Sequence, residues 1–203
     1  APFFVALARR FDPLNPEPVI LTARSVAEIE GLDAGIQYLQ DELQKGSVAR
    51  AELSAAIAEL EIKKGQWSVA QTFIDQARQA NPDYAYPWKL QAQIYLNDEN
   101  TDKKALDRAL EAFKSYSDRN ASDPSGYLER YRIFMKKAQF EKAEIELNKI
   151  YAIYPKYPNL HYYKGVMYSN MANHKVAAEE YVAELKNNPN SVPTLIALGK
   201  ALI

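Results

Sequence analysis

Side chains that could hold a metal ion or act as a nucleophile are scarce in this sequence. The chain has no cysteine, which excludes disulfides, thiolate metal sites and a cysteine nucleophile. Its two histidines, His161 and His174, do not stand in an HExxH-type spacing, which would put two imidazoles on one helix face. We therefore expect no metal site, and we assign His161 a packing role.

Carboxylates occur in close pairs, at Glu144 and Glu146 and again at Glu179 and Glu180. General acid–base catalysis needs such groups in a pocket that shifts their pKa values. We expect these four on solvated helix faces instead. The sequence also lacks the GxSxG, GxGxxG and P-loop motifs of nucleophilic and phosphate-binding sites. We therefore expect no enzymatic activity and no cofactor.

Tyrosine is the residue type that most favours a binding function. The chain has 14 tyrosines, and a tyrosine offers a large contact area together with a polar group. Tyr86 and Tyr162 are out of phase with the predicted core and are the better surface candidates. The tyrosines in core phase are Tyr95, Tyr127, Tyr131, Tyr168 and Tyr181.

The charge of the chain is balanced overall and uneven along its length. Residues 1–100 hold 9 Lys/Arg and 14 Asp/Glu (−5), and residues 101–203 hold 16 and 12 (+4), which together give −1. A net charge near zero gives no general attraction to nucleic acid, so we expect no nucleic-acid partner. No apolar run approaches the ~20 residues that span a bilayer. The apolar residues 3–8 precede Arg9 and Arg10, the wrong order for a signal peptide. The compartment, cytoplasm or periplasm, stays open.

Small, aromatic and proline residues recur with a period near 34 residues. Gly31 and Gly65 are one period apart, and each is predicted to end one helix (18–30 and 50–64) and to precede another (33–45 and 67–80). Such a period indicates stacked helix–turn–helix units. The two clearest copies of the pattern are Gly65, Trp67, Ala70, Ala77 and Pro82, and Gly165, Tyr168, Ala177, Tyr181 and Pro189.

This pattern resembles the tetratricopeptide repeat over nearly the whole chain. The resemblance implies an all-α fold, a right-handed α-solenoid of about twelve helices in antiparallel pairs, with small residues where paired helices cross. We expect residues 1–203 to form a single domain of five to six units. The match is weaker in residues 14–48, where Ile36 and Leu43 replace the two alanines. A polar insertion near residues 97–104 interrupts the period.

Both terminal units look incomplete. Val5, Ala8 and Pro13 match a second helix without its first, and the apolar residues from Leu195 to Ile203 begin a last helix. Because terminal repeats need a polar outer face, we expect these ends to meet further repeats or another surface.

A competing resemblance covers residues 18–39 only. Residues 18–24 with 32–39 are similar to the late part of a bacterial receiver domain. Gln40 and Asp41 stand where that family has Lys-Pro after its last strand. The 34-residue glycine spacing favours the repeat.

In the tetratricopeptide family the first helices of successive pairs line a concave groove. Carried over to this chain, the resemblance implies a groove whose middle is basic and rich in amides, suited to an extended peptide of acidic character. Gln93 and Glu129 stand at the asparagine positions of the family's chaperone-tail clamp, so we do not expect that clamp. The candidate partner-binding residues are Lys63, Tyr86, Lys89, Gln93, Asn97, Leu128, Arg132, Lys136, Tyr162 and Asn170, with Glu59 beside Lys63.

Three functions are consistent with these observations. The first is a protein–protein interaction scaffold that binds a peptide or protein in the groove, within a larger bacterial assembly. The second is a structural scaffold that self-assembles end to end, as a homo-oligomer, through its apolar ends and its −5/+4 charge asymmetry. The third is the docking or regulatory region of a larger enzyme or signalling protein.

Overall fold

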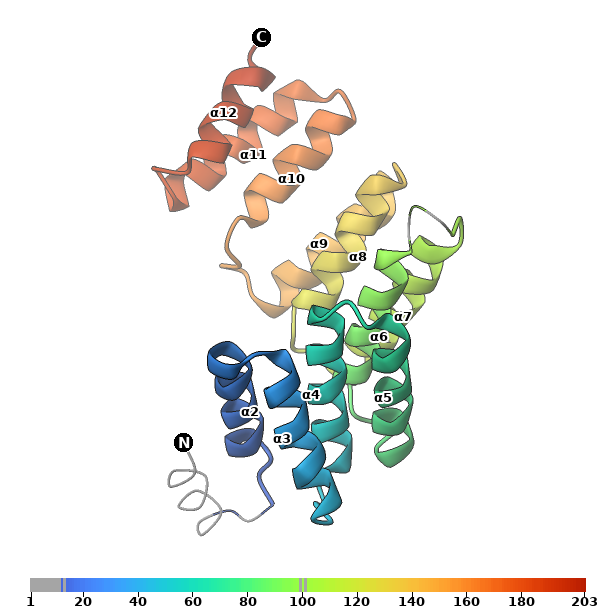
Figure 1. Cartoon of the computed structure of the whole chain (residues 1–203). Coiled ribbons are helices and arrows are strands. Elements are labelled where there is room, and N and C mark those ends of the chain that lie inside the picture. The colour runs from blue at the N-terminus through green and yellow to red at the C-terminus, as the bar shows by residue number, and fades with distance from the viewer. Residues whose placement is uncertain (1–11, 13, 99, 101) are drawn as a thin grey trace. The chain divides into compact units, whose positions relative to one another are not determined.

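The computed structural model describes residues 12, 14–98, 100 and 102–203, and within these residues it has eleven α-helices and no strand. Helices α2 to α11 form five antiparallel pairs, and α12 follows them (Figure 1). We call the two members of each pair the first and the second helix. The predicted half-unit at Val5, Ala8 and Pro13 lies outside the described residues. Residues 18–24 are helical, so the receiver-domain alternative, which needs a strand nearby, is wrong.

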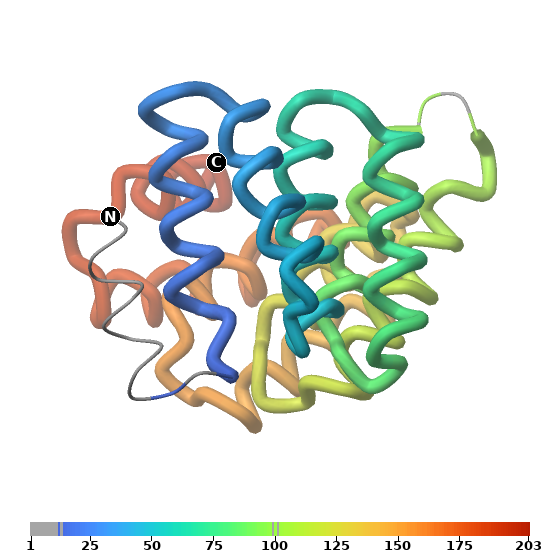
Figure 2. Tube along the Cα trace, turned by 60° about the horizontal axis from the view of Figure 1, so that its bottom comes forward, coloured from blue at the N-terminus to red at the C-terminus, as the bar shows by residue number. Residues whose placement is uncertain are grey.

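The chain divides into two compact units, of which unit 1 ends at Arg119 and unit 2 is Asn120–Ile203. In unit 1 each helix packs against the next one along the chain, and Figure 2 shows the alternating direction of the trace. The helices of unit 1 are α2 (Glu17–Glu30), α3 (Leu32–Gln44), α4 (Arg50–Lys63), α5 (Trp67–Ala80), α6 (Tyr86–Asn97) and α7 (Ala105–Arg119).

Unit 2 repeats the same arrangement. Its pairs are α8 with α9 and α10 with α11, and α12 packs against α11. Its helices are α8 (Ser125–Lys136), α9 (Phe140–Ile153), α10 (Leu160–Asn170), α11 (His174–Asn187) and α12 (Val192–Ala201).

The second helices bury a repeated triad at positions i, i+4 and i+7, one face of an α-helix. In α5 the triad is Ala70, Ile74 and Ala77, all fully buried. The small first residue lets the paired helices approach closely. The triads of the other four pairs are Gly35, Leu39 and Glu42 in α3, Ala109, Phe113 and Tyr116 in α7, Ala143, Leu147 and Ile150 in α9, and Ala177, Tyr181 and Glu184 in α11.

The prediction that Ile36 and Leu43 stand in place of the alanines is wrong by one residue. Gly35 is the residue at the close crossing, because a Cβ added there would lie 2.6 Å from the Cβ of Ala27. The physical reason is the length of the turn. Only Gly31 separates α2 from α3, whereas residues 64–66 separate α4 from α5. Equal glycine spacing therefore does not give equal helix register.

Most first helices end in a turn that needs one left-handed residue. After α4 this residue is Gly65 (φ 79°), and after α8 and α10 it is Ala138 (φ 52°) and Ala172 (φ 56°). In each turn two N–H groups donate back to the last carbonyls of the helix, as from Ala138 to Met135 at 3.0 Å and from Gln139 to Phe134 at 2.9 Å. The connection from α6 to α7 is longer and covers residues 98–104.

Candidate functional site

The first helices of unit 1 are joined by one carboxylate. Glu59 of α4 accepts hydrogen bonds on Oε2 from Arg24 Nη2 of α2 at 2.8 Å and from Tyr86 Oη of α6 at 3.0 Å. Lys63, one turn further along α4, lies 3.0 Å from Glu59 Oε1. The Glu59 cluster, defined as Arg24, Glu59, Lys63 and Tyr86, thus connects three successive first helices.

The electrostatics of the cluster favour an ionised Glu59. Burial by itself would raise the pKa of this half-buried carboxyl, but hydrogen bonds from Arg24 and Lys63 outweigh burial and the pKa is lowered. Burial is also the main reason why the pKa of Tyr86 is raised, and the adjacent Glu59 carboxylate adds to it. Burial raises the pKa of the neighbouring Tyr84 to about 12. Both tyrosines therefore stay protonated, and Tyr86 donates to Glu59.

Two residues predicted for the groove are therefore already engaged inside the protein. The Tyr86 hydroxyl and the Lys63 ammonium both serve Glu59, and Tyr86 is half-buried rather than a surface residue. Sequence reasoning placed Glu59 beside Lys63 but missed Arg24. A signal did exist, because Arg24 precedes Glu59 by 35 residues, about one repeat.

The rest of the predicted strip in unit 1 lies along α6. Lys89, Gln93 and Asn97 follow each other at intervals of four, which puts them on one helix face. Gln93 and Asn97 are exposed. The Lys89 ammonium lies 5.4 Å from the centre of the Tyr116 ring, so its stem is held against α7.

In unit 2 the predicted residues lie on α8 and α10. Arg132 and Lys136 are exposed, and Arg132 is paired with Glu129 on the same helix. Leu128 is only 7% exposed and belongs to the core, so it is not open to a partner.

The two α10 residues differ in how much of them is open. Tyr162 is half-buried, with its ring centre 6.1 Å from that of Tyr181. Asn170 is exposed, although its amide donates to the carbonyl of Val166 at 2.8 Å. A partner lying on α10 would therefore meet Asn170 more readily than the Tyr162 ring.

The expectation of solvated carboxylates is wrong for one residue. Glu146 is 2% exposed and forms ion pairs at 3.0 Å with Arg130 and with Lys149. Glu180 is half-buried and lies 2.7 Å from Nδ1 of His161. The packing role assigned to His161 thus includes a polar contact between α10 and α11.

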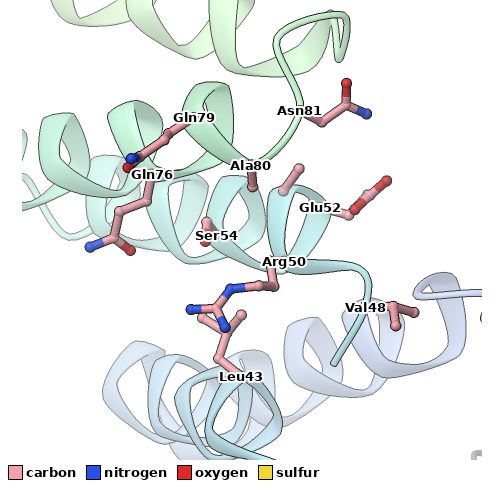
Figure 3. Close-up of a pocket in the computed structure, with 10 residues that line it drawn as sticks. Leu43, Val48, Arg50, Glu52, Ser54, Gln76, Gln79, Ala80 and Asn81 are labelled. Atoms are coloured by element: carbon pink, nitrogen blue, oxygen red, sulfur yellow. The ribbon is translucent and has the colours of Figure 1, made fainter. Parts of the chain in front are cut away.

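A pocket of about 520 Å³ opens in unit 1 between the ends of α3 and α5 and the start of α4 (Figure 3). In Figure 3 the guanidinium of Arg50 and the carboxylate of Glu52 point in opposite directions, so the two charges do not neutralise each other. Gln76, Gln79 and Asn81 add amide groups to the lining of the pocket. These donors suit a carboxylate or a peptide group, and no sequence motif pointed to them.

Neither a candidate metal site nor a candidate membrane-spanning helix occurs among the described residues. Among the described residues, no group of three His, Cys, Asp or Glu side chains lies close enough to hold a metal ion. In the same residues, no helix combines the length and the apolar character needed to cross a membrane.

Comparison with solved structures identifies the fold. TTC0263, a thermophilic TPR protein of Thermus thermophilus, superposes with a TM-score of 0.64 at 18% identity and covers 93% of this chain and 99% of its own. YrrB, a TPR protein with an unusual peptide-binding site, superposes with a TM-score of 0.65 at 16% identity. The match covers 95% of this chain and 96% of YrrB. A chain of the APC/C hetero-tetramer Cut9–Hcn1 superposes with a TM-score of 0.71 at 14% identity. The match covers 98% of this chain and 39% of that chain. No protein-family model and no curated protein sequence matches the chain. The chain therefore has the tetratricopeptide-repeat fold.

Proposed function

We propose that this chain is a protein-interaction scaffold that binds an extended peptide along the first helices of its repeats. The observation that carries the proposal is that several side chains of the first helices are polar and exposed. Gln93 and Asn97 on α6 are polar and exposed, and so are Arg132 and Lys136 on α8. Two relatives in fold support it, because one is described with a peptide-binding site and one is a complex of two proteins.

The preferred peptide is acidic. Lys89, Arg132 and Lys136 put three cations on first helices, and a carboxylate can form charge-assisted hydrogen bonds with each of them. Arg132 is already paired with Glu129 on its own helix, a surface pair of small energy that a peptide carboxylate can replace.

Peptide display tests this function. Peptides selected from a random library on the intact chain should carry net negative charge, and R132E/K136E should weaken the best of them about tenfold or more in fluorescence anisotropy. K175E, a reversal of an exposed lysine on the second helix α11, is the matched control and should leave binding nearly unchanged. Selection of neutral peptides, or equal weakening by both variants, would count against the proposal.

A second candidate, self-assembly, rests on α12. Apolar side chains on and next to this helix are largely exposed: Val192 (62%), Leu195 (49%), Ile196 (56%) and Leu202 (71%). A second copy of the chain could cover them. Light scattering over a wide concentration range should then show association that L195E/I196E abolishes. A constant monomer mass would exclude this candidate.

A further inference from the structure

A buried glutamate without a partner lies in unit 2. Glu184 of α11 is 4% exposed, and in the part of the chain that the structure describes no hydrogen bond or ion pair reaches its carboxylate. The side chain lines a pocket, and its oxygens are not among the buried polar atoms that lack a partner, so the carboxylate opens to the pocket. A mostly shielded carboxylate gains from a cationic partner at such a place. Glu184 therefore presents to this pocket a carboxylate that has no charged partner among the described residues.

The repeat itself does not require a glutamate at this position. Glu184 is the i+7 member of the α11 triad that begins with the buried Ala177. The corresponding residue of α9, seven positions after Ala143, is Ile150, which is fully buried. An apolar side chain therefore satisfies the packing, and the carboxylate of Glu184 needs another explanation.

Other buried glutamates of the second helices indicate what that explanation is. Glu42 of α3 and Glu146 of α9 each bind the ammonium of a lysine three residues later, Lys45 at 2.8 Å and Lys149 at 3.0 Å. In α11 the residue three positions after Glu184 is Asn187, whose side chain is neutral and cannot form an ion pair. Glu184 therefore lacks the lysine three residues later that Glu42 and Glu146 each have.

Glu184 lines a pocket that has room for such a group. The pocket has a volume of about 450 Å³ and lies between the α9–α10 connection and the end of α11. Tyr157 lines the pocket, and an aromatic ring can bind a cation. Amide oxygens can accept hydrogen bonds from an ammonium. Its polar lining residues are Lys156, Tyr157, His161, Glu184, Asn187 and Asn188.

We propose that this Glu184 pocket binds an alkylammonium group from outside the chain, either the lysine side chain of a partner peptide or a free small amine. Glu184 forms the ion pair, and Asn187, Asn188 and Tyr157 surround the ammonium and its stem. Lys156 stands at the same pocket and repels a bound cation. The pocket shares no residue with the first-helix positions proposed to bind the peptide, and it does not depend on the function proposed for them.

The test is a titration of the intact chain followed by NMR on the side-chain amides of Asn187 and Asn188. The probes are the capped tripeptide Gly-Lys-Gly, the same peptide with norleucine for lysine, and cadaverine. The lysine peptide should shift both amides, and the norleucine peptide should not. E184Q, which keeps the shape and removes the charge, should weaken binding about tenfold or more. E179Q, at an exposed glutamate of the same helix, should change nothing.

A second variant keeps the test decisive if E184Q folds poorly. K156Q alters an exposed side chain and should strengthen binding, because it removes a like charge from the pocket. Tighter binding of the lysine peptide than of cadaverine assigns the ammonium to a partner protein, and the reverse order assigns it to a free amine. Equal binding of the norleucine peptide, unchanged binding in both variants, or no shift at millimolar probe would overturn the proposal.

Discussion

Glu59 shows how a single polar side chain organises several helices. Its carboxylate, whose side chain is 16% exposed, receives hydrogen bonds from Arg24 of α2 and Tyr86 of α6 and an ion pair from Lys63. A hydrogen bond to a charged group contributes about 1.5–3 kcal/mol, more than one between neutral groups. Because the cluster joins three successive first helices, it links neighbouring repeats and contributes to their stability.

Replacement of Glu59 by glutamine should therefore destabilise the chain. We expect E59Q to lower the free energy of unfolding by about 2 kcal/mol at neutral pH, because Arg24 loses its charged acceptor while still partly buried. Urea unfolding followed by circular dichroism measures this change. E28Q, at an exposed glutamate of α2, is the control and should change stability little.

The effect of E59Q should also depend on pH with a defined sign. The folded-state pKa of Glu59 lies below its ordinary value, so its contribution is complete above the unfolded-state pKa and is lost as the pH falls through the folded-state pKa. The difference between wild type and E59Q should thus be largest at neutral pH and shrink in acid. A difference that is constant down to strongly acidic pH would show that the glutamine acts through packing and not through charge.

At the scale of elements, some paired helices cross closely at a glycine. A Cβ added to Gly165 of α10 would lie 2.4 Å from the ring of Tyr181 on α11, whereas one added to Gly199 of α12 would meet nothing within 4 Å. Tyr181 is fully buried and has little room to move. Substitution of these two glycines by alanine should therefore change the stability of the chain in opposite directions.

We expect G165A to destabilise the chain by about 1–3 kcal/mol, because the new methyl group overpacks the crossing. G199A should stabilise it by up to about 1 kcal/mol, because alanine is the better helix former. Thermal unfolding of both variants measures the two effects. Similar shifts in the same direction would show that backbone freedom, and not the crossing, determines the response.

The ends of the first helices allow a stabilising change. Ala138 adopts the left-handed conformation that Gly65 adopts in the equivalent turn after α4, and a Cβ in that region costs about 1–2 kcal/mol. A138G should therefore stabilise unit 2 by about 1 kcal/mol, less a part lost to the greater freedom of glycine in the unfolded chain. The control is A183G in the interior of α11, which should destabilise by about 1 kcal/mol. A loss of stability in A138G would contradict the interpretation that the left-handed conformation of Ala138 is strained.

The sequence predicted the elements well and some of their details poorly. Periodicity and the positions of proline and glycine predicted α4 and α5 nearly to the residue. The crossing at Gly35 was missed, because a one-residue turn shifts the helix register while Gly31 and Gly65 keep the repeat spacing. The burial of Glu146 was missed because its partner Arg130 is on another helix, and single-sequence reading does not pair distant charges.

At the scale of the whole molecule, the described helices group into two compact units whose boundary in the chain falls between Arg119 and Asn120. In a repeat array each repeat contacts only the repeats next to it. The stability of the array is therefore close to a sum of the stabilities of single repeats and of the interfaces between adjacent repeats. Local opening can then occur at a lower free energy than global unfolding. A destabilising substitution should therefore increase local opening mainly in the compact unit that contains it.

Hydrogen exchange measured by mass spectrometry tests this locality with the two crossing glycines. G165A should raise amide exchange across α10 and α11 about fivefold or more, the factor expected for the loss of one to two kcal/mol, and should leave α4 and α5 nearly unchanged. G35A, whose new Cβ would lie 2.7 Å from the carbonyl oxygen of Ala23, should act on α2 and α3 and leave α10 and α11 unchanged. If either variant raises exchange equally in both units, the chain unfolds as one cooperative body. Local opening at the Glu59 cluster and at the Glu184 pocket would then be controlled by the same equilibrium.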